Sequence, residues 1–159
     1  MPFSDGKVTQ AAAHRAAQGK QLVSAVERIQ PEHLAQRRVD GFVLYNHVVS
    51  VPAGHRLVFV SGQLARNAAG EIVGASDMRA QIRQVGENLK AALAAAGASL
   101  GDLVKTTTFV TDIDEFFRHV DIRHAYLGPA LPTSTTIEVR RLAHPDLLVE
   151  IEAIACVVE

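Results

Sequence analysis

Residues 147–158 alternate between two sets of side chains, the pattern of a β-strand whose two faces have different surroundings. The first set is entirely apolar: Leu147, Val149, Ile151, Ala153, Ala155 and Val157. The second set surrounds Glu150 and Glu152 with Leu148, Ile154, Cys156 and Val158. A solvent-facing surface seldom carries so much apolar area around two carboxylates. We therefore expect helices to cover one face of this strand and a second copy of the chain to cover the other.

The two glutamates would then lie at or near a subunit interface. Partial burial raises the pKa of a carboxyl group, which prepares the group to act as a general acid or base. Both glutamates are therefore candidates for proton transfer. The alternative is structural: ion pairs with Arg140, Arg141 or Lys105 across the interface.

The remaining pattern predicts an α+β domain with a mixed sheet and two helices packed on one face. The first helix is capped by Ser76 or Asp77 and ends at Gly97, and the second begins at a capping-box spacing, Asp112 to Glu115. Strands are expected over 42–51, 57–61, 71–73, 103–110, 132–139 and 147–158, with hairpin-like pairs at both ends and a βαβ crossover around the first helix.

Residues 1–38 are predicted to form an N-terminal helical extension, and 39–159 the main domain. Good helix formers predict a helix over residues 9–34, and an apolar stripe ahead of Pro31 supports it: Leu22, Val23, Val26 and Ile29. We expect this helix to pack on the domain, and a partner-binding helix is the alternative.

Composition excludes several functions. A chain of 159 residues suits one domain. Its net charge of −1 argues against binding to nucleic acid or to a membrane surface. A single cysteine excludes internal disulfides and zinc sites with several cysteine ligands. Because neither a secretory signal nor a long apolar run is visible, we expect a cytoplasmic protein. His119 and His124 lack metal-ligand spacing, and no nucleotide-binding or serine-hydrolase motif occurs.

Several short segments form a specific pattern when they are taken together. They are Val-Phe-Val-Ser-Gly-Gln at 58–63, Gln81, Glu-Asn-Leu at 87–89, Ala-Gly-Ala-Ser at 96–99, Val-Lys-Thr at 104–106 and Val-Glu-Ile-Glu-Ala-Ile-Ala at 149–155. From about Tyr45 to Val157, about 70 per cent of the chain, the sequence resembles the Rid/YjgF family, the reactive intermediate deaminases.

The resemblance implies a chorismate-mutase-like fold that forms a homotrimer with clefts between subunits. It also implies hydrolysis of reactive enamines and imines, such as 2-aminoacrylate, to a ketoacid and ammonia, with no metal or organic cofactor. Carried onto this chain, the glutamate that positions the attacking water falls on Glu150. Ser61, Gly62 and Gln63 would line the pocket.

The chain departs from the family pattern where the deaminases bind the substrate carboxylate. Their Pro-Ala-Arg-Ser becomes Pro-Thr-Ser-Thr at 132–135, which places Ser134 at the arginine position. A serine hydroxyl cannot replace the charge of a bidentate arginine. Either Arg123 or Arg140 supplies that charge, or the substrate carries no carboxylate there, or hydrolysis has been lost.

Other departures change the lining of the cleft. His47 falls near a cleft tyrosine of the deaminases, and Asp121 replaces an asparagine. The leading hypothesis is a hydrolase in which Glu150 activates water and His47 carries protons near neutral pH. Ser134 and Thr135 would contact the substrate through their hydroxyls.

The rival hypothesis is a non-catalytic small-molecule sensor or partner-binding trimer of the same fold. The ribonuclease activity sometimes attached to this family fits poorly with a net charge of −1.

Overall fold

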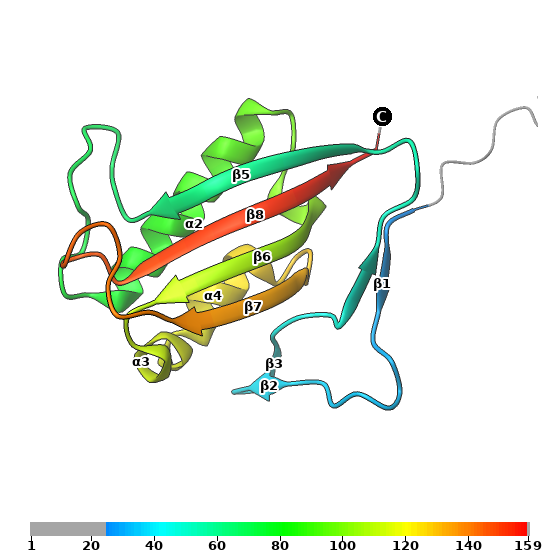
Figure 1. Cartoon of the computed structure of the whole chain (residues 1–159), viewed down its shortest axis with the longest axis horizontal. Helices are drawn as coiled ribbons and strands as arrows, with labels where there is room; N and C mark the ends of the chain where they lie inside the picture. The colour runs from blue at the N-terminus through cyan, green and yellow to red at the C-terminus, as the bar shows by residue number, and fades with distance from the viewer. Residues whose placement is uncertain (1–24, 159) are drawn as a thin grey trace, which may run out of the picture.

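A four-stranded sheet forms the centre of the computed structural model, which describes residues 25–158 (Figure 1). Its strands, in spatial order, are β5 (Arg56–Leu64), β8 (Val149–Val157), β6 (Leu103–Val110) and β7 (Thr133–Glu138). β8 is antiparallel to both of its neighbours, and β7 is parallel to β6. The last strand in the sequence therefore lies inside the sheet, and β5, β6 and β7 all run in the same direction.

Helices cover one face of this sheet, as predicted (Figure 1). α2 (Met78–Ala95) links β5 to β6, and α3 (Ile113–Arg118) and α4 (Val120–Leu127) link β6 to β7. The Asp77 side chain caps α2 by accepting a hydrogen bond from the amide of Ala80, and Gly97, with a φ of +67°, follows its end. A short 3₁₀ turn, Leu100–Asp102, precedes β6.

The alternation of β8 is confirmed. Val149, Ile151, Ala153 and Ala155 are buried against the helices with at most 4% of their surface exposed. On the opposite face Glu150 and Ile154 are half-buried and Glu152 is exposed. No helix covers this second face in the described chain (Figure 1).

The segment before β5 differs from the prediction. β1 (Glu27–Ile29) pairs with β4 (Val48–Ser50), and β2 (Arg38–Val39) forms a hairpin with β3 (Phe42–Val43). The helix expected over residues 9–34 is therefore wrong for residues 25–34, and residues 1–24 lie outside the described residues. One physical reason is tertiary: the Arg28 side chain donates to the carbonyl of Ala130 and to those of Gly101 and Leu103, which holds β1 extended. The domain boundary at residue 38 stays a prediction.

Four further expectations are corrected. The strand expected over 42–51 is two short strands, and that over 71–73 is one isolated bridge between Arg66 and Ile72. The helix that begins after Asp112 ends at Arg118, and a separate helix begins at Val120. The C-terminal hairpin is absent because β8 pairs with β5 and β6 rather than with β7.

Candidate functional site

A β-bulge in β5 faces the two glutamates of β8. The pairing runs from Val60 with Ala153 to Gln63 with Ile151, so two residues of β5, Ser61 and Gly62, lie opposite one residue of β8. Bulges re-aim side chains and are frequent beside active sites. The Ser-Gly-Gln motif therefore forms an irregularity in the sheet at the level of Glu152.

Glu150 lies directly against Gly62. A Cβ atom built at Gly62 would overlap Oε1 of Glu150, so only glycine leaves room for this carboxylate. Glu150 also shares a groove with Arg141 and with Phe109 of β6. Among the described residues, no salt bridge or hydrogen bond engages the Glu150 carboxylate. The side chain is thus positioned by shape, with its oxygens available.

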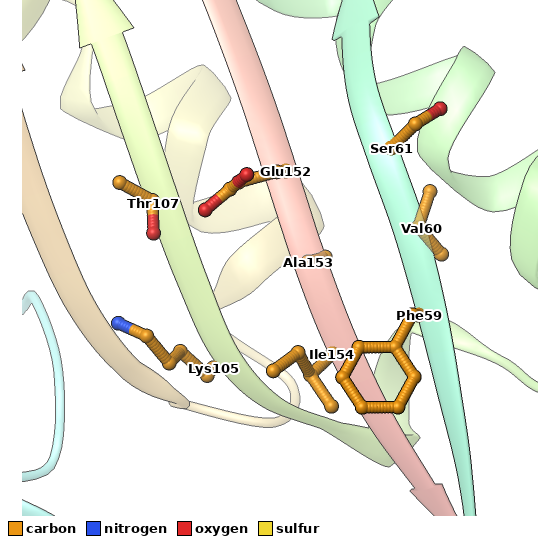
Figure 2. Close-up of a pocket in the computed structure, with 8 residues that line it drawn as sticks. All are labelled: Phe59, Val60, Ser61, Lys105, Thr107, Glu152, Ala153 and Ile154. Atoms are coloured by element: carbon orange, nitrogen blue, oxygen red, sulfur yellow. The ribbon is translucent and has the colours of Figure 1, made fainter.

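The open face of the sheet continues beyond this carboxylate as a shallow pocket (Figure 2). Phe59 lies beside Ile154 at its lower end, and the Glu152 carboxylate extends toward Thr107. Lys105 and Ser61 complete the polar part of the lining. Within the described part of one chain, no salt bridge joins the two glutamates to Arg140, Arg141 or Lys105. The pairing of these residues across a subunit interface stays a prediction.

A second group of predicted residues meets at the outer edge of the sheet, beside β7. Arg123, Ser134 and Thr135 line one pocket of about 240 Å³, here named the arginine pocket. Its other lining residues are Arg37, Leu44, Tyr45, Ile113, Phe117 and Thr136. No acidic side chain is among them, and the nearby Glu138 carboxylate accepts a hydrogen bond from the amide of Ile113.

Arg123 is buried in this pocket, with 3% of its surface exposed. Its Nη2 donates to the carbonyl of Leu44 at 3.0 Å and to Oγ of Ser134 at 3.2 Å, and its Nε has no partner. Burial, and secondarily the charge of Arg37, lowers the pKa of Arg123 to about 10. The guanidinium is therefore still charged at neutral pH, and it reaches the residue that occupies the deaminase arginine position.

The two groups do not meet within one chain. Ser134 is level with Thr106 of β6, which is level with Ala153 of β8, three residues from Glu150. Two strand spacings and three residues along a strand place the Cα atoms of Ser134 and Glu150 roughly 14 Å apart. Ser134 also points toward α4, whereas Glu150 lies on the open face.

Three predicted residues lie outside both groups. Asp121 forms an exposed ion pair with Arg79 of α2, at 2.6 Å and 2.9 Å, and this pair lowers the pKa of the Asp121 carboxyl. Arg140 is exposed just after β7. His47 lies 3.1 Å from the carbonyl of Ala35, and its ring contacts that of Tyr45 edge-on, so it approaches the arginine pocket only through Tyr45. Gln63 remains beside its motif, and its amide donates to Ser61.

Sequence reasoning did not assign Arg37 or Tyr45 to a site. Arg37 belongs to the polar stretch Gln-Arg-Arg at 36–38, and no periodicity marks it. Tyr45 lies two residues from His47, so it is the aromatic side chain that a search near His47 could have found.

Metal ligation and membrane insertion find no support in residues 25–158. No three His, Cys, Asp or Glu side chains there could jointly hold a metal ion. None of the helices found in that range is long and apolar enough to cross a membrane.

Comparison with known proteins identifies the family of the chain. The family model described as endoribonuclease L-PSP matches residues 36–157. A solved structure of a Rid family protein from Yersinia pestis superposes with a TM-score of 0.71 and 34% sequence identity, covering 83% of this chain and 98% of that one. The chain belongs to the Rid/YjgF family.

Two relatives show the range of names within this Rid family. A RutC family protein of Pyrococcus horikoshii is 42% identical over 67% of this chain and 82% of its own length. The 2-iminobutanoate/2-iminopropanoate deaminase of Escherichia coli K12 is 38% identical over 69% of this chain and 85% of its own length. The chain therefore has the fold of the Rid family, and its relatives include a protein named as a deaminase.

Proposed function

We propose that this Rid protein hydrolyses small reactive enamines or imines and releases ammonia, at a cleft that two copies of the chain complete. The observation that carries the proposal is the placement of Glu150 against Gly62, where the carboxylate is held by shape and has no described ion-pair partner. The similarity to an Escherichia coli deaminase supports the reaction class.

The reaction follows from the groups available. The Glu150 carboxylate accepts a proton from water as the water oxygen adds to the imine carbon. The nitrogen takes up a proton and leaves as ammonia, and the carbon becomes a carbonyl. His47, which lies outside both groups of site residues in one chain, stays the predicted donor of that proton. These steps use only acid–base groups, so the proposal requires no cofactor. The proposal also keeps the predicted cytoplasmic location.

We infer a second copy because Ser134, which Arg123 contacts, and Glu150 are far apart in one chain. The strand positions separate the Cα atoms of Ser134 and Glu150 by roughly 14 Å and put the two side chains on different faces of the sheet. The family resemblance suggests a homotrimer with clefts between subunits. In such a cleft, Arg123, Ser134 and Thr135 of one copy would hold the substrate, and Glu150 with Ser61 and Gly62 of the next copy would carry out the chemistry.

The direct test is ammonia release from a panel of enzymatically generated imines with and without carboxylates. Glu150→Gln should lose at least about 100-fold in turnover, the usual contribution of one general base, while the assembly stays intact. Glu32→Gln, an exposed glutamate in the loop after β1, is the control and should retain activity. Equal turnover by wild type and Glu150→Gln would refute the assignment.

Gly62→Ala tests the placement of Glu150 rather than its charge. The added methyl group overlaps Oε1, so the carboxylate must move and turnover should fall by about tenfold or more. Gly101→Ala is the matched control because its Cβ would lie 3.5 Å from Ser99 Oγ, an ordinary contact. In the Glu150→Gln background, Gly62→Ala should have little further effect on turnover. An equal loss in both backgrounds would show that the glycine acts elsewhere.

A non-catalytic binding trimer is the second candidate, and Ser134 at the deaminase arginine position favours it. This candidate predicts saturable binding of small molecules with no acceleration on any imine. It also predicts that deleting the residues before Arg37 changes the binding of a partner.

A further inference from the structure

The arginine pocket contains two guanidinium groups and no acid. Arg123 donates only to a carbonyl and a hydroxyl, and its buried Nε is without a partner. Isolating a charge from water and from counter-charges is costly unless a bound ion compensates it. The Arg123 guanidinium at the interior end of the pocket therefore carries a positive charge that one bound anionic group could compensate.

Arg37 brings a second positive charge to the same pocket. Its guanidinium carbon lies 4.6 Å from the centre of the Phe117 ring, a cation–π contact that holds the side chain at the rim. The backbone carbonyl of Arg37 accepts a hydrogen bond from the amide of Leu44, which fixes the segment beside the pocket. The described residues offer no carboxylate to Arg37 either.

The two cations act on each other. The charge of Arg37 contributes to lowering the pKa of Arg123, which shows that they are within electrostatic reach. Two like charges with no anion between them repel, and one anionic group placed at each guanidinium would convert this repulsion into two favourable pairs.

Hydroxyl groups complete the lining. Ser134 is oriented because its Oγ accepts hydrogen bonds from Thr106 and from Arg123. Thr135 and Thr136 follow it along β7, and Tyr45 faces them from the segment after β3. These hydroxyls can donate to the remaining oxygens of an acid, and about 240 Å³ holds a molecule of a few carbon atoms.

We infer that the arginine pocket selects small organic dianions that carry two carboxylates, with one carboxylate at Arg123 and the other at Arg37. This inference rests on the proposed function: the substrate would be an imine or enamine derived from a dicarboxylic amino acid. Glu150 would act on its imine carbon as described above.

The test is equilibrium binding to the full-length chain, with succinate as the dicarboxylate, butyrate as the matched monocarboxylate and inorganic phosphate as the compact anion. Succinate should bind at least about tenfold more tightly than butyrate, and addition of salt should reduce the difference. Equal affinities for succinate and butyrate, or tight binding of phosphate alone, would overturn the inference.

Arg37→Gln separates the two ends of the pocket. It should weaken succinate binding by about tenfold and leave butyrate binding unchanged, because only the second carboxylate loses its partner. Arg38→Gln is the matched control: its side chain donates to Gln36 and to the carbonyl of Gly41, and it does not line the pocket. Arg123→Lys should weaken both ligands. A loss of succinate binding in Arg38→Gln equal to that in Arg37→Gln would contradict the assignment.

Measurements of binding and of turnover can refute the dianion pocket and the proposed hydrolysis independently. Glu150→Gln should still bind succinate more tightly than butyrate, since Glu150 does not line the arginine pocket within one chain. Succinate selectivity without any imine turnover would refute the proposed hydrolysis and support the dianion pocket. Turnover that depends on Glu150 but shows no preference for dicarboxylic imines would support the proposed hydrolysis and refute the dianion pocket.

Discussion

The buried charge of Arg123, a residue that we propose to bind the substrate, is expected to reduce the stability of the fold. Its pKa of about 10, below the ordinary value of an arginine, means that the folded protein disfavours the charged form. The single substitution Arg123→Met removes this charge and keeps most of the side-chain volume.

We expect Arg123→Met to raise the free energy of unfolding by about 1 kcal/mol, because replacing an uncompensated buried charge by an apolar group is often stabilising. The melting temperature would rise by about 2–4 °C in a chain of this size. The carbonyl of Leu44 loses a donor in the variant, which limits the gain. Thermal unfolding in the presence of succinate is the complementary measurement: the ligand should stabilise wild type and not the variant. Destabilisation by more than about 2 kcal/mol would show that Arg123 is primarily structural.

The contribution of Arg123 to the free energy of unfolding should change with pH in one direction. The unfolded arginine keeps its proton to a higher pH than the folded one. Above about pH 10 the unfolded state therefore binds more protons, and the Arg123 contribution to stability rises with pH. The stability advantage of Arg123→Met over wild type should therefore be full at about pH 8 and smaller at about pH 11. An advantage that grows with pH would contradict the assigned shift.

At the scale of elements, α2 and α4 approach each other closely because α2 has a glycine in its interior. A Cβ atom at Gly86 would overlap the ring of Tyr126. The Tyr126 hydroxyl donates to Glu87 of α2 at 2.9 Å, which holds the ring across the helix. Burial and the neighbouring Glu87 together raise the pKa of this phenol.

Gly86→Ala should therefore destabilise the protein although alanine is the better helix former. The propensity gain is about 1 kcal/mol, whereas forcing the ring away costs about 1–3 kcal/mol. In a Tyr126→Ala background the overlap is gone, and the same substitution should stabilise by up to about 1 kcal/mol. Denaturant unfolding of the four proteins of this cycle measures both signs. A destabilising effect of equal size in both backgrounds would rule out the ring as its cause.

Elements with strong local signals are the ones that sequence reasoning placed correctly. The strand Leu103–Val110 and the capped helix after Asp77 lie where their composition and caps predict. Two features were beyond reach because they depend on distant partners. Residues 27–29 are extended through contacts with residues about 75 and 102 positions away. β8 lies inside the sheet rather than beside β7, and no local pattern records that choice.

The candidate site shows the same division. Motif residues that are close in the sequence, Ser61, Gly62 and Gln63, were placed together, and the strand alternation put Glu150 on the open face. The arginine pocket was only partly anticipated, because Arg123 was one of two candidates and Arg37 was missed. Its lining comes from five separate stretches of the chain, which the fold alone brings together.

At the scale of the whole molecule, the open face of the sheet carries several exposed apolar side chains, as a face that another molecule covers does. Leu57 is 46% exposed, Phe59 73% and Ile137 41%. Helices occupy only the other face, so the chain has no element among its described residues to cover these side chains. A second copy would exclude them from water and bring the two halves of the proposed site together.

Phe59→Glu should therefore dissociate the assembly and abolish imine hydrolysis at once. The family resemblance predicts a wild-type mass three times 17.1 kDa in light scattering, and the variant should approach 17.1 kDa because a charge replaces apolar surface at the interface. Leu34→Glu is the control: Leu34 is 49% exposed in the segment between β1 and β2, away from the sheet face, and its variant should keep both assembly and activity. Because the Cα atoms of Ser134 and Glu150 lie roughly 14 Å apart in one chain, a monomer with full turnover would refute the shared site. A wild type that is monomeric would leave the apolar face to a different partner.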